Sequence, residues 1–374
     1  MLKNLPLSHF PIAQKEQLNA ALLDLGNEEK EIEGRLLNKK LFSQLLDRKF
    51  NKNFEKFIKI IGGYSNQTYQ IDNLVLRFPK LTNPLVRNLS IEVYNLQIAH
   101  TLKFSPLEIR AYYAKHNLFI TRFIPQYQSL TQTDFKKPEK IIAAAKLIKK
   151  LHYCNKKFKK NLETPLAFVN NISKSFEKIK PILNKEDYVI LNKINTIKAI
   201  LADFNVPERP SHGDLHHGNL IELNNNIQLI DWEVSSMEDP AYDIARLFCV
   251  SDFSEESRII FLEHYKQAGN ITLSALEIEN LKQRIQLFIP INSLSIVFWA
   301  RFEIQFRKGE KKILLEKTIA TFHEKTLQTL TNLNLDEFKI ENYTLPKQSL
   351  FFSPPEFLPI AANTIVDSTQ LKST

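Results

Sequence analysis

The sequence predicts an α+β chain in which a small strand-rich part precedes a larger helical part. Residues 57–79 carry the strand character, because short apolar runs there are separated by a pair of glycines and by the turn pair Asp72-Asn73. Residues 211–245 contain a second hairpin, with apolar runs on both sides of three asparagines. Much of the remaining chain after residue 138 has the apolar spacing of amphipathic helices.

Further elements are expected along the chain. Strands are predicted at residues 57–61, between the glycine pair and the Asp72-Asn73 turn, and at residues 74–78, 118–124, 220–223 and 227–230. Helices are predicted at residues 86–102, 138–152, 188–204, 241–250, 256–268, 275–287 and 293–306. In the helix at 138–152 the apolar residues should share one side and the lysines the other. Ser274 and Glu277 have the spacing of a capping box, which marks the start of the helix at 275–287.

Composition excludes several classes of protein. The two cysteines, Cys154 and Cys249, give neither a disulfide framework nor zinc-binding spacing, so a reducing cytoplasm is expected. The N-terminus has no long apolar segment typical of a secretory signal. The most apolar segment, Leu287–Phe302, contains proline, asparagine and arginine, and we expect a buried helix rather than a membrane span. The net charge is +9, but the lysines are dispersed and no nucleic-acid-binding motif is present.

The stretch SHGDLHHGNLIELNNNIQLIDWE carries the chemistry of the chain. His212, Asp214 and Asn219 precede its first strand, and Asp231 and Glu233 follow its second. A hairpin brings these two ends side by side. Phosphoryl transfer needs such a set, in which one carboxylate accepts the proton of an attacking hydroxyl while a second carboxylate and an amide oxygen hold Mg²⁺. Protein kinases place the same residue types at the same spacing, in H-R-D-L-x-x-x-N followed by an Asp.

The motifs HGDLHHGN, IDWE and EDPAYDIA resemble the aminoglycoside phosphotransferase / choline kinase superfamily, and Asp-Trp-Glu is similar to its choline, ethanolamine and thiamine kinase branch. The resemblance implies a protein-kinase-like bilobal fold with a small β-rich N-lobe, a larger helical C-lobe and ATP in the cleft. It implies that Asp214 is the catalytic base, that Asn219 and Asp231 bind Mg²⁺, and that His212 braces the catalytic loop. Asp239 and Asp243 would tie the next helix to that loop.

The strand-rich part supplies the residues expected to bind nucleotide. Glycines let a backbone approach phosphate closely, and the segment GGYSNQTYQI resembles the family's paired-glycine pattern. The phosphate-binding candidates in this segment are Gly62, Gly63, Ser65 and Asn66. Arg77 ends the following strand, where a cation can pair with phosphates and with Glu92 of the next helix. The resemblance places the adenine ring against the backbone near Thr121 and Phe123.

The acceptor site is expected in the C-terminal helices. Phe298, Trp299, Phe302 and Phe306 recur at helical spacing, which fits either core packing or an aromatic wall against an ammonium group. Trp299 and Phe302, with Glu233, are the candidate acceptor-binding residues. Choline kinases often carry Tyr after Asp-x-Glu, and this chain has Val234, so choline itself is not singled out among the amino alcohols.

The sequence therefore predicts an ATP- and Mg²⁺-dependent kinase acting on a hydroxyl of a small amino alcohol such as choline, ethanolamine or thiamine. Two alternatives stay open: an aminoglycoside or sugar phosphotransferase of the same fold, and a nucleotide-binding regulator without turnover. The expected parts are a helical extension (1–50), an N-lobe (51–125), a C-lobe (126–335) and an extended tail (336–374). No oligomeric state is specified by the sequence.

Overall fold

A computed structural model describes residues 58–60, 66–71, 74–79, 89–113, 118–125, 127–161, 185–269, 271–335 and 338. Its contacts divide the chain into two compact units, which separate between Gln126 and Tyr127. The expected N-terminal extension, the glycine pair and nearly all of the expected tail lie outside the described residues. Strands gather in the first unit and helices dominate the second, so the α+β class is confirmed.

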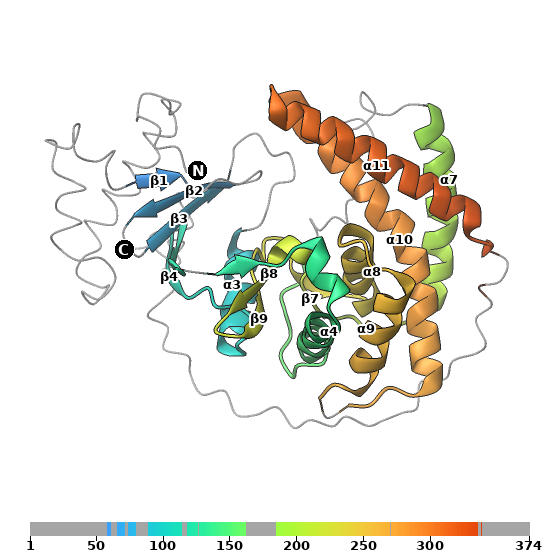
Figure 1. Cartoon of the computed structure of the whole chain (residues 1–374), viewed down its shortest axis with the longest axis horizontal. Helices are drawn as coiled ribbons and strands as arrows, with labels where there is room; N and C mark the ends of the chain where they lie inside the picture. Colours follow the sequence, from blue (N-terminus) through green and yellow to red (C-terminus); the bar gives the residue numbers. More distant parts are fainter. Residues whose placement is uncertain are drawn as a thin grey trace, which may run out of the picture. The chain divides into compact units, whose positions relative to one another are not determined.

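The first unit is built on a five-stranded antiparallel sheet in the order β1-β2-β3-β5-β4 (Figure 1). Its strands are β1 (Ile58–Ile60), β2 (Asn66–Ile71), β3 (Leu74–Pro79), β4 (Ile109–Tyr113) and β5 (Leu118–Arg122). Ile71 pairs with Leu74, and the turn predicted between them at Asp72-Asn73 lies outside the described residues. Strands β3 and β5 then pair along Leu74–Arg77, which places Val75 opposite Thr121.

Helix α3 (Leu89–Thr101) belongs to the same unit and lies within the expected range of 86–102, of which residues 86–88 are outside the described part of the chain. Leu89, Val93, Leu96 and Ala99 are buried, a spacing that places them on one face of the helix. Glu92 is buried on this helix too, and a buried carboxylate requires a partner.

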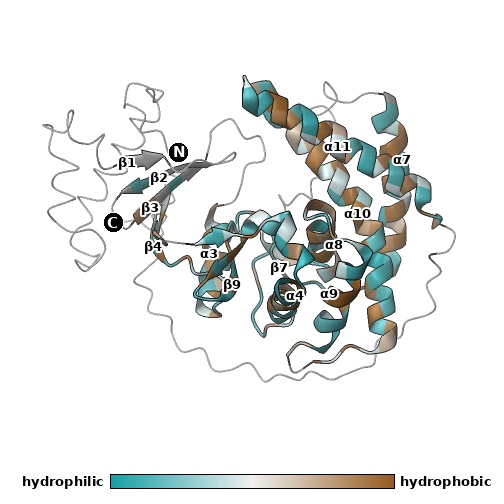
Figure 2. Cartoon of the chain, in the orientation of Figure 1, coloured by the Kyte–Doolittle hydropathy of each residue, from teal (hydrophilic) through white to brown (hydrophobic). Residues whose placement is uncertain are grey.

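The second unit is mainly helical. Its elements are β6 (Gln128–Ser129), η5 (Gln132–Lys136), α4 (Pro138–His152), α7 (Lys185–Asp203), β7 (Arg209–Ser211), η7 (His217–Asn219), β8 (Leu220–Leu223), β9 (Asn226–Leu229), β10 (Ser236–Glu238), α8 (Pro240–Val250), α9 (Glu255–Gln267), α10 (Ala275–Glu303), η8 (Ile304–Phe306) and α11 (Glu310–Asn332). Figure 2 shows hydrophobic and hydrophilic residues together along α4 and α11, as expected of helices that bury one face.

The central hairpin forms as the sequence predicts. Strand β8 pairs antiparallel with β9, and β6 adds a third strand on the other edge of β8. The turn residues Asn224 and Asn225 both have positive φ, 52° and 62°, which asparagine tolerates better than most residues. Ile230 donates its backbone N–H to the Asn219 carbonyl at 3.0 Å, so the pairing continues one step beyond the strands. The two ends of the motif therefore lie next to each other.

Helix α10 differs from the sequence prediction, which divided it into two helices at residues 275–287 and 293–306. The structure has one 29-residue helix that continues through Pro290, and the capping box of Ser274 and Glu277 is present at its start. Loss of one backbone hydrogen bond at proline is tolerated here because Pro290 and its neighbours are buried against other elements. Among the described residues, α10 with η8 is the one helix long and apolar enough to cross a membrane, but 78% of its apolar window is buried within the protein.

Lys149 on α4 is a second difference, because we expected the lysines of this helix on its polar side. Its side chain is 1% exposed, and its ammonium lies over the Tyr153 ring, 3.8 Å from the centroid. Within the described residues its Nζ has no hydrogen-bond partner. Burial, together with the charge of Arg209, lowers the pKa of Lys149 to about 8. The buried charge is therefore a net cost to folding at neutral pH.

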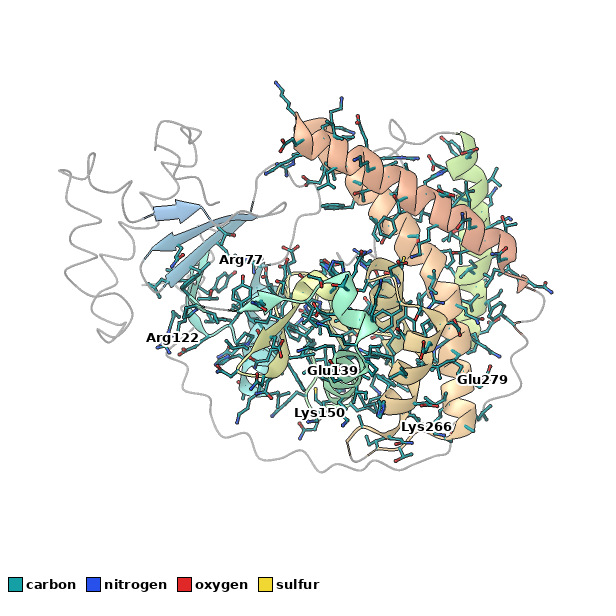
Figure 3. All side chains as sticks on the ribbon, viewed as in Figure 1. Arg77, Arg122, Glu139, Lys150, Lys266 and Glu279 are labelled. Atoms are coloured by element: carbon teal, nitrogen blue, oxygen red, sulfur yellow. The ribbon has the colours of Figure 1, made fainter. Side chains whose placement is uncertain are left out.

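We predict that Lys149→Met increases the free energy of unfolding by about 2 kcal/mol at pH 7, since no charge would then have to be buried. The unfolded chain binds this proton up to about pH 10.4, so the gain should be largest below pH 8, shrink as the pH rises, and vanish once both states are neutral. Urea denaturation across this pH range measures the effect. Lys150→Met, at an exposed neighbouring site (Figure 3), should change stability by less than about 0.5 kcal/mol. A less stable Lys149→Met protein would show that the cation–π contact outweighs desolvation.

Candidate active site

The loop from β7 to η7 carries the predicted catalytic residues, and Gly213 sets its path. Gly213 has φ of 82°, and a Cβ at this position would lie 2.3 Å from the Val234 carbonyl oxygen. A side chain is thus excluded by both the backbone conformation and the space available. The close approach packs the loop against the segment that follows β9, which contains Asp231 and Glu233.

Gly213→Ala should therefore destabilise the protein by about 3 kcal/mol or more, with loss of the loop geometry. Left-handed backbone alone costs an alanine about 1–2 kcal/mol, and the clash adds to this. Gly269→Ala is the matched control, because Gly269 has φ of 75° but a Cβ there meets nothing within 4 Å in the described part of the chain. Thermal unfolding of both variants gives the comparison. Equal losses would show that the approach to Val234 is not restrictive.

Asp243 of α8 fixes the same loop through its backbone. Its Oδ2 accepts the His212 N–H at 2.7 Å and its Oδ1 accepts the Gly213 N–H at 2.8 Å. His152 Nε2 lies 3.2 Å from Oδ2, and His152 Nδ1 lies 2.8 Å from the Tyr265 hydroxyl. Burial would raise the pKa of the Asp243 carboxyl, but the hydrogen bond from His152 and the neighbouring donors hold it below its ordinary value. Asp243 therefore acts as a buried anchor for the loop.

His212 is buried between the two sides of the hairpin motif. Its Nε2 lies 2.9 Å from the Ile230 carbonyl oxygen, so this nitrogen carries a proton and donates. Its ring packs on Trp232, with 4.8 Å between the centroids. These contacts join the loop to the residues on either side of Asp231, and a role of His212 in bracing the catalytic loop stays a prediction.

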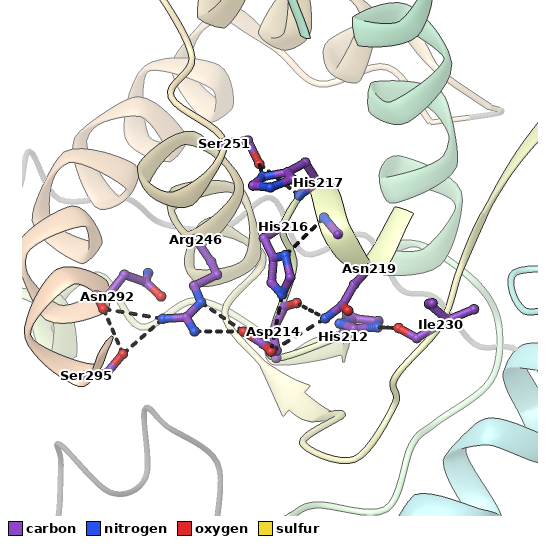
Figure 4. A network of polar contacts seen from close by, with 12 residues as sticks. His212, Asp214, His216, His217, Asn219, Ile230, Arg246, Ser251, Asn292 and Ser295 are labelled. Atoms are coloured by element: carbon purple, nitrogen blue, oxygen red, sulfur yellow. Dashed lines mark hydrogen bonds and ion pairs between the residues drawn. The ribbon is translucent and has the colours of Figure 1, made fainter. Parts of the chain in front are cut away.

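Asp214 points from this loop toward α8 (Figure 4). Arg246 donates from Nε at 3.0 Å and from Nη2 at 2.7 Å, both to the same carboxylate oxygen, Oδ1. Among the described residues, the other oxygen, Oδ2, has two long contacts, to Asn219 Nδ2 at 3.5 Å and to His216 Nε2 at 3.6 Å. The Asp214 side chain is 23% exposed. One oxygen is therefore held and the other is left for a further partner.

The charge state of Asp214 follows from these neighbours. Burial would raise the pKa of the carboxyl, but the Arg246 guanidinium and His216 outweigh burial and hold the pKa well below its ordinary value. Gly218 donates its N–H to His216 Nδ1 at 3.1 Å, so the Nε2 of that ring carries the proton that faces Asp214. Asp214 is consequently an anion at neutral pH, the state that a proton acceptor requires.

Asn219 and Asp231 lie at the same end of the β8–β9 hairpin. Asn219 donates from Nδ2 to the Asp214 carbonyl at 2.9 Å, which turns its amide oxygen to the other side. Asp231 has φ of 65°, a strained conformation for a non-glycine residue that is common at functional sites. An amide oxygen and a carboxylate are ligands that Mg²⁺ prefers. No group of three or more His, Cys, Asp or Glu side chains suited to a metal occurs within the described ranges.

The acceptor-binding candidates occupy two places in the second unit. Glu233 is only 7% exposed and follows the fully buried Trp232. Trp299 and Phe302 are half-buried on α10, and the Phe302 ring lies 5.3 Å from that of Phe306. Ser295, whose hydroxyl accepts from Arg246 Nη1 at 3.2 Å, precedes Trp299 by four residues and Phe302 by seven. These spacings put all three residues on one face of the helix.

The nucleotide-binding candidates belong to the first unit. Arg77 of β3 (Figure 3) donates from Nη1 to Glu92 Oε1 of α3 at 3.0 Å, which is the pairing predicted. Thr121 is buried in β5, Phe123 follows that strand, and Asn66 begins β2. Gly62, Gly63 and Ser65 lie outside the described residues.

Arg246 is the site residue that the sequence reasoning missed. It lies 32 residues after Asp214, in the helical segment PAYDIARLFCV. A usable signal was present, since Arg246 follows the predicted anchor Asp243 by three residues and so shares its helix face. Its partner could not be read from that spacing alone.

A family model described as "Phosphotransferase enzyme family" matches residues 56–278, more than half of the chain. The chain belongs to the phosphotransferase enzyme family. The match spans both units, from the strand-rich sheet to the start of α10. The resemblance inferred from HGDLHHGN and IDWE is confirmed.

Known relatives agree with this membership. "Protein LicA" of Haemophilus influenzae is 23% identical over 240 residues, which cover 61% of this chain and 68% of that protein. The solved choline kinase LicA from Streptococcus pneumoniae has a TM-score of 0.60 at 20% identity and covers 74% of this chain and 93% of its own. A LicA structure in complex with AMP has a TM-score of 0.54 at 20% identity, covering 71% and 91%. The kinase-like fold is therefore confirmed.

Proposed function

We propose that this phosphotransferase is an ATP-dependent kinase that transfers the γ-phosphoryl group to a hydroxyl of a small amino alcohol, such as choline, ethanolamine or thiamine. The observation that carries the proposal is the held carboxylate of Asp214, which is bound to Arg246 through Oδ1 and keeps Oδ2 for an incoming hydroxyl. The AMP complex of LicA and the choline kinase named among the similar structures support nucleotide and amino-alcohol specificity.

In this mechanism the acceptor hydroxyl donates its hydrogen bond to Asp214 Oδ2. As the acceptor oxygen forms its bond to the γ-phosphorus, the hydroxyl proton moves to Asp214 and the bond from phosphorus to the bridging oxygen breaks. ADP leaves with the electron pair of that bond. The anionic state of Asp214 makes the proton transfer possible, and the contacts of His212 and Asp243 hold the loop in place during it.

Asn219 and Asp231 are the residues that would hold Mg²⁺, with nucleotide phosphates supplying further oxygens. When bound, the ion would neutralise negative charge on the transferring phosphoryl group. The fixed orientation of the Asn219 amide and the strained backbone of Asp231 support this assignment. Arg77, paired with Glu92, would bind phosphate oxygens, together with the Gly62–Asn66 turn, and backbone near Thr121 and Phe123 would meet adenine.

The face of α10 that carries Trp299 and Phe302 is proposed as one wall of the acceptor site. Ser295 on this face is linked to Asp214 through Arg246, and Trp299 lies one helical turn farther along. A rise of about 6 Å separates residues four apart in a helix, so a short acceptor could place its hydroxyl at Asp214 and its ammonium against the aromatic rings. Glu233 adds a buried carboxylate for a cationic acceptor.

Both cysteines, Cys154 and Cys249, are unpaired, which supports our proposal of a reducing, cytoplasmic location. We also retain the division into an N-lobe at 51–125 and a C-lobe at 126–335, with extensions at 1–50 and 336–374, as a proposal.

A screen of ADP formation tests the substrate assignment. Purified protein with ATP and Mg²⁺ is assayed against choline, ethanolamine, thiamine, sugars and aminoglycosides, with nucleotide binding measured in parallel by calorimetry. We expect turnover on one amino alcohol. Turnover confined to an aminoglycoside or a sugar would show that the acceptor is not an amino alcohol. Nucleotide binding without turnover on any compound would favour a nucleotide-binding regulator without enzymatic activity.

A further inference from the structure

Arg246 connects three parts of the second unit through its guanidinium (Figure 4). From α8 it donates twice to Asp214 Oδ1, and from Nη1 it donates to the Ser295 hydroxyl at 3.2 Å and the Asn292 carbonyl at 3.4 Å, both on α10. The side chain is 12% exposed, so these contacts are largely screened from water. The catalytic loop and α10 therefore share one cation.

We propose that Arg246 is a positioning residue that fixes the Asp214 carboxylate for proton abstraction and couples its orientation to helix α10. The inference deepens the proposed function and rests on Asp214 being the base.

Arg246 holds Asp214 through a single carboxylate oxygen. A guanidinium usually meets a carboxylate with two parallel bonds, one to each oxygen. Here both bonds, from Nε and Nη2, end on Oδ1. Such a contact limits rotation of the carboxylate without occupying Oδ2, whose polar neighbours in the described part of the chain stand at 3.5 and 3.6 Å. Arg246 thus selects which oxygen receives the proton.

Arg246 is itself anchored to two residues of α10. Ser295 donates its hydroxyl proton to the Asn292 carbonyl at 2.7 Å, and the Asn292 amide donates to the Tyr242 carbonyl of α8 at 3.3 Å. Asn292 is fully buried and Ser295 is 5% exposed. The guanidinium is consequently tied to a buried junction of α8 and α10. A shift of α10 on acceptor binding would move Arg246, and with it Asp214.

A matched ion pair gives the control for this role. Arg284 of α10 donates from Nε to Asp239 Oδ2, at the start of α8, at 2.8 Å. It also joins α8 to α10 and is 8% exposed, but it has no contact with the catalytic loop among the interactions described. Loss of Arg284 should therefore lower stability while leaving the contacts of Arg246 with Asp214, Asn292 and Ser295 in place.

The test compares Arg246→Gln, Arg246→Lys, Ser295→Ala and Arg284→Gln on the acceptor found in the screen. Misplacing a reacting group by about 1 Å costs on the order of 100-fold in rate. We expect Arg246→Gln to lower kcat about 100-fold while KM for ATP and acceptor changes less than about threefold. Arg246→Lys, which keeps the positive charge but loses the planar pair of donor nitrogens, should recover part of this loss, and Ser295→Ala should lose less than tenfold. Arg284→Gln should lower the melting temperature but keep kcat within about twofold.

A double variant distinguishes a role of Arg246 that acts through Asp214 from a role that is independent of it. If Arg246 acts through Asp214, the Asp214→Asn/Arg246→Gln protein should have the same residual kcat as Asp214→Asn alone, since residues acting as a unit are not additive. Multiplied losses, or equal kcat values for Arg246→Gln and Arg284→Gln, would overturn the positioning role and leave the base intact. Full activity of Asp214→Asn would instead overturn the proposed base, and the inference with it.

Discussion

Asp214→Asn should lower kcat by about 10²–10⁴-fold, the usual contribution of a general base. Asparagine has the same shape and keeps one oxygen for the two Arg246 donors, so the fold should survive. It cannot accept the hydroxyl proton at neutral pH, and KM for ATP should change less than about threefold because Asp214 is not assigned to nucleotide binding. Steady-state ADP formation with saturating acceptor measures the effect.

Asp252→Asn is the matched control for this change. Asp252 is exposed in the same unit and has φ of 53°, a conformation that asparagine tolerates. The Asp252→Asn substitution removes the same charge from the protein at a position outside the catalytic loop, so kcat should remain within about twofold. An Asp214→Asn protein as active as this control would exclude Asp214 as the base.

Asp243→Asn should have the largest effect on stability, a loss of about 3–5 kcal/mol. The native carboxylate receives the His212 and Gly213 backbone N–H groups on its two oxygens, so an amide NH₂ must face one of these donors. Because the site is fully buried, water cannot relieve that conflict. Guanidinium denaturation gives the free energy, and kcat should fall as well because the loop loses its anchor.

Tyr265→Phe provides the comparison within the same network. It removes only the hydroxyl that lies 2.8 Å from His152 Nδ1 and keeps the ring, so about 1 kcal/mol should be lost. If Asp243→Asn costs no more than Tyr265→Phe, the carboxylate is not the anchor of the catalytic loop.

The sequence was informative where function depends on short-range spacing. His212, Asp214 and Asn219 lie within the eight consecutive residues HGDLHHGN, so their spacing can be read directly from the sequence. The three asparagines between two apolar runs predict the hairpin that follows. The pair Arg77–Glu92 was predictable for a related reason, since a strand end and the following helix are close in sequence. The family resemblance was inferred from these same local patterns, and the family model confirms it.

The features that were missed depend on tertiary packing. Arg246 meets Asp214 across 32 residues, a contact that exists only once α8 is placed against the loop. The Lys149 ammonium lies over the rings of Tyr153 and Tyr265, 3.8 and 5.0 Å from their centroids, and the helical spacing of the sequence does not predict this packing. A proline normally interrupts a helix, but burial of the residues around Pro290 keeps α10 continuous.

The most direct test of the proposed kinase activity is identification of the phosphorylated product by ³¹P NMR. The reaction contains the protein, ATP, Mg²⁺ and the acceptor selected by the screen, with Asp214→Asn protein as the parallel sample. The proposed function predicts a phosphate monoester of the acceptor that grows in equal amount with ADP and is lost in the variant. Inorganic phosphate as the sole product, or unchanged ATP with every acceptor tested, would contradict transfer to a small alcohol.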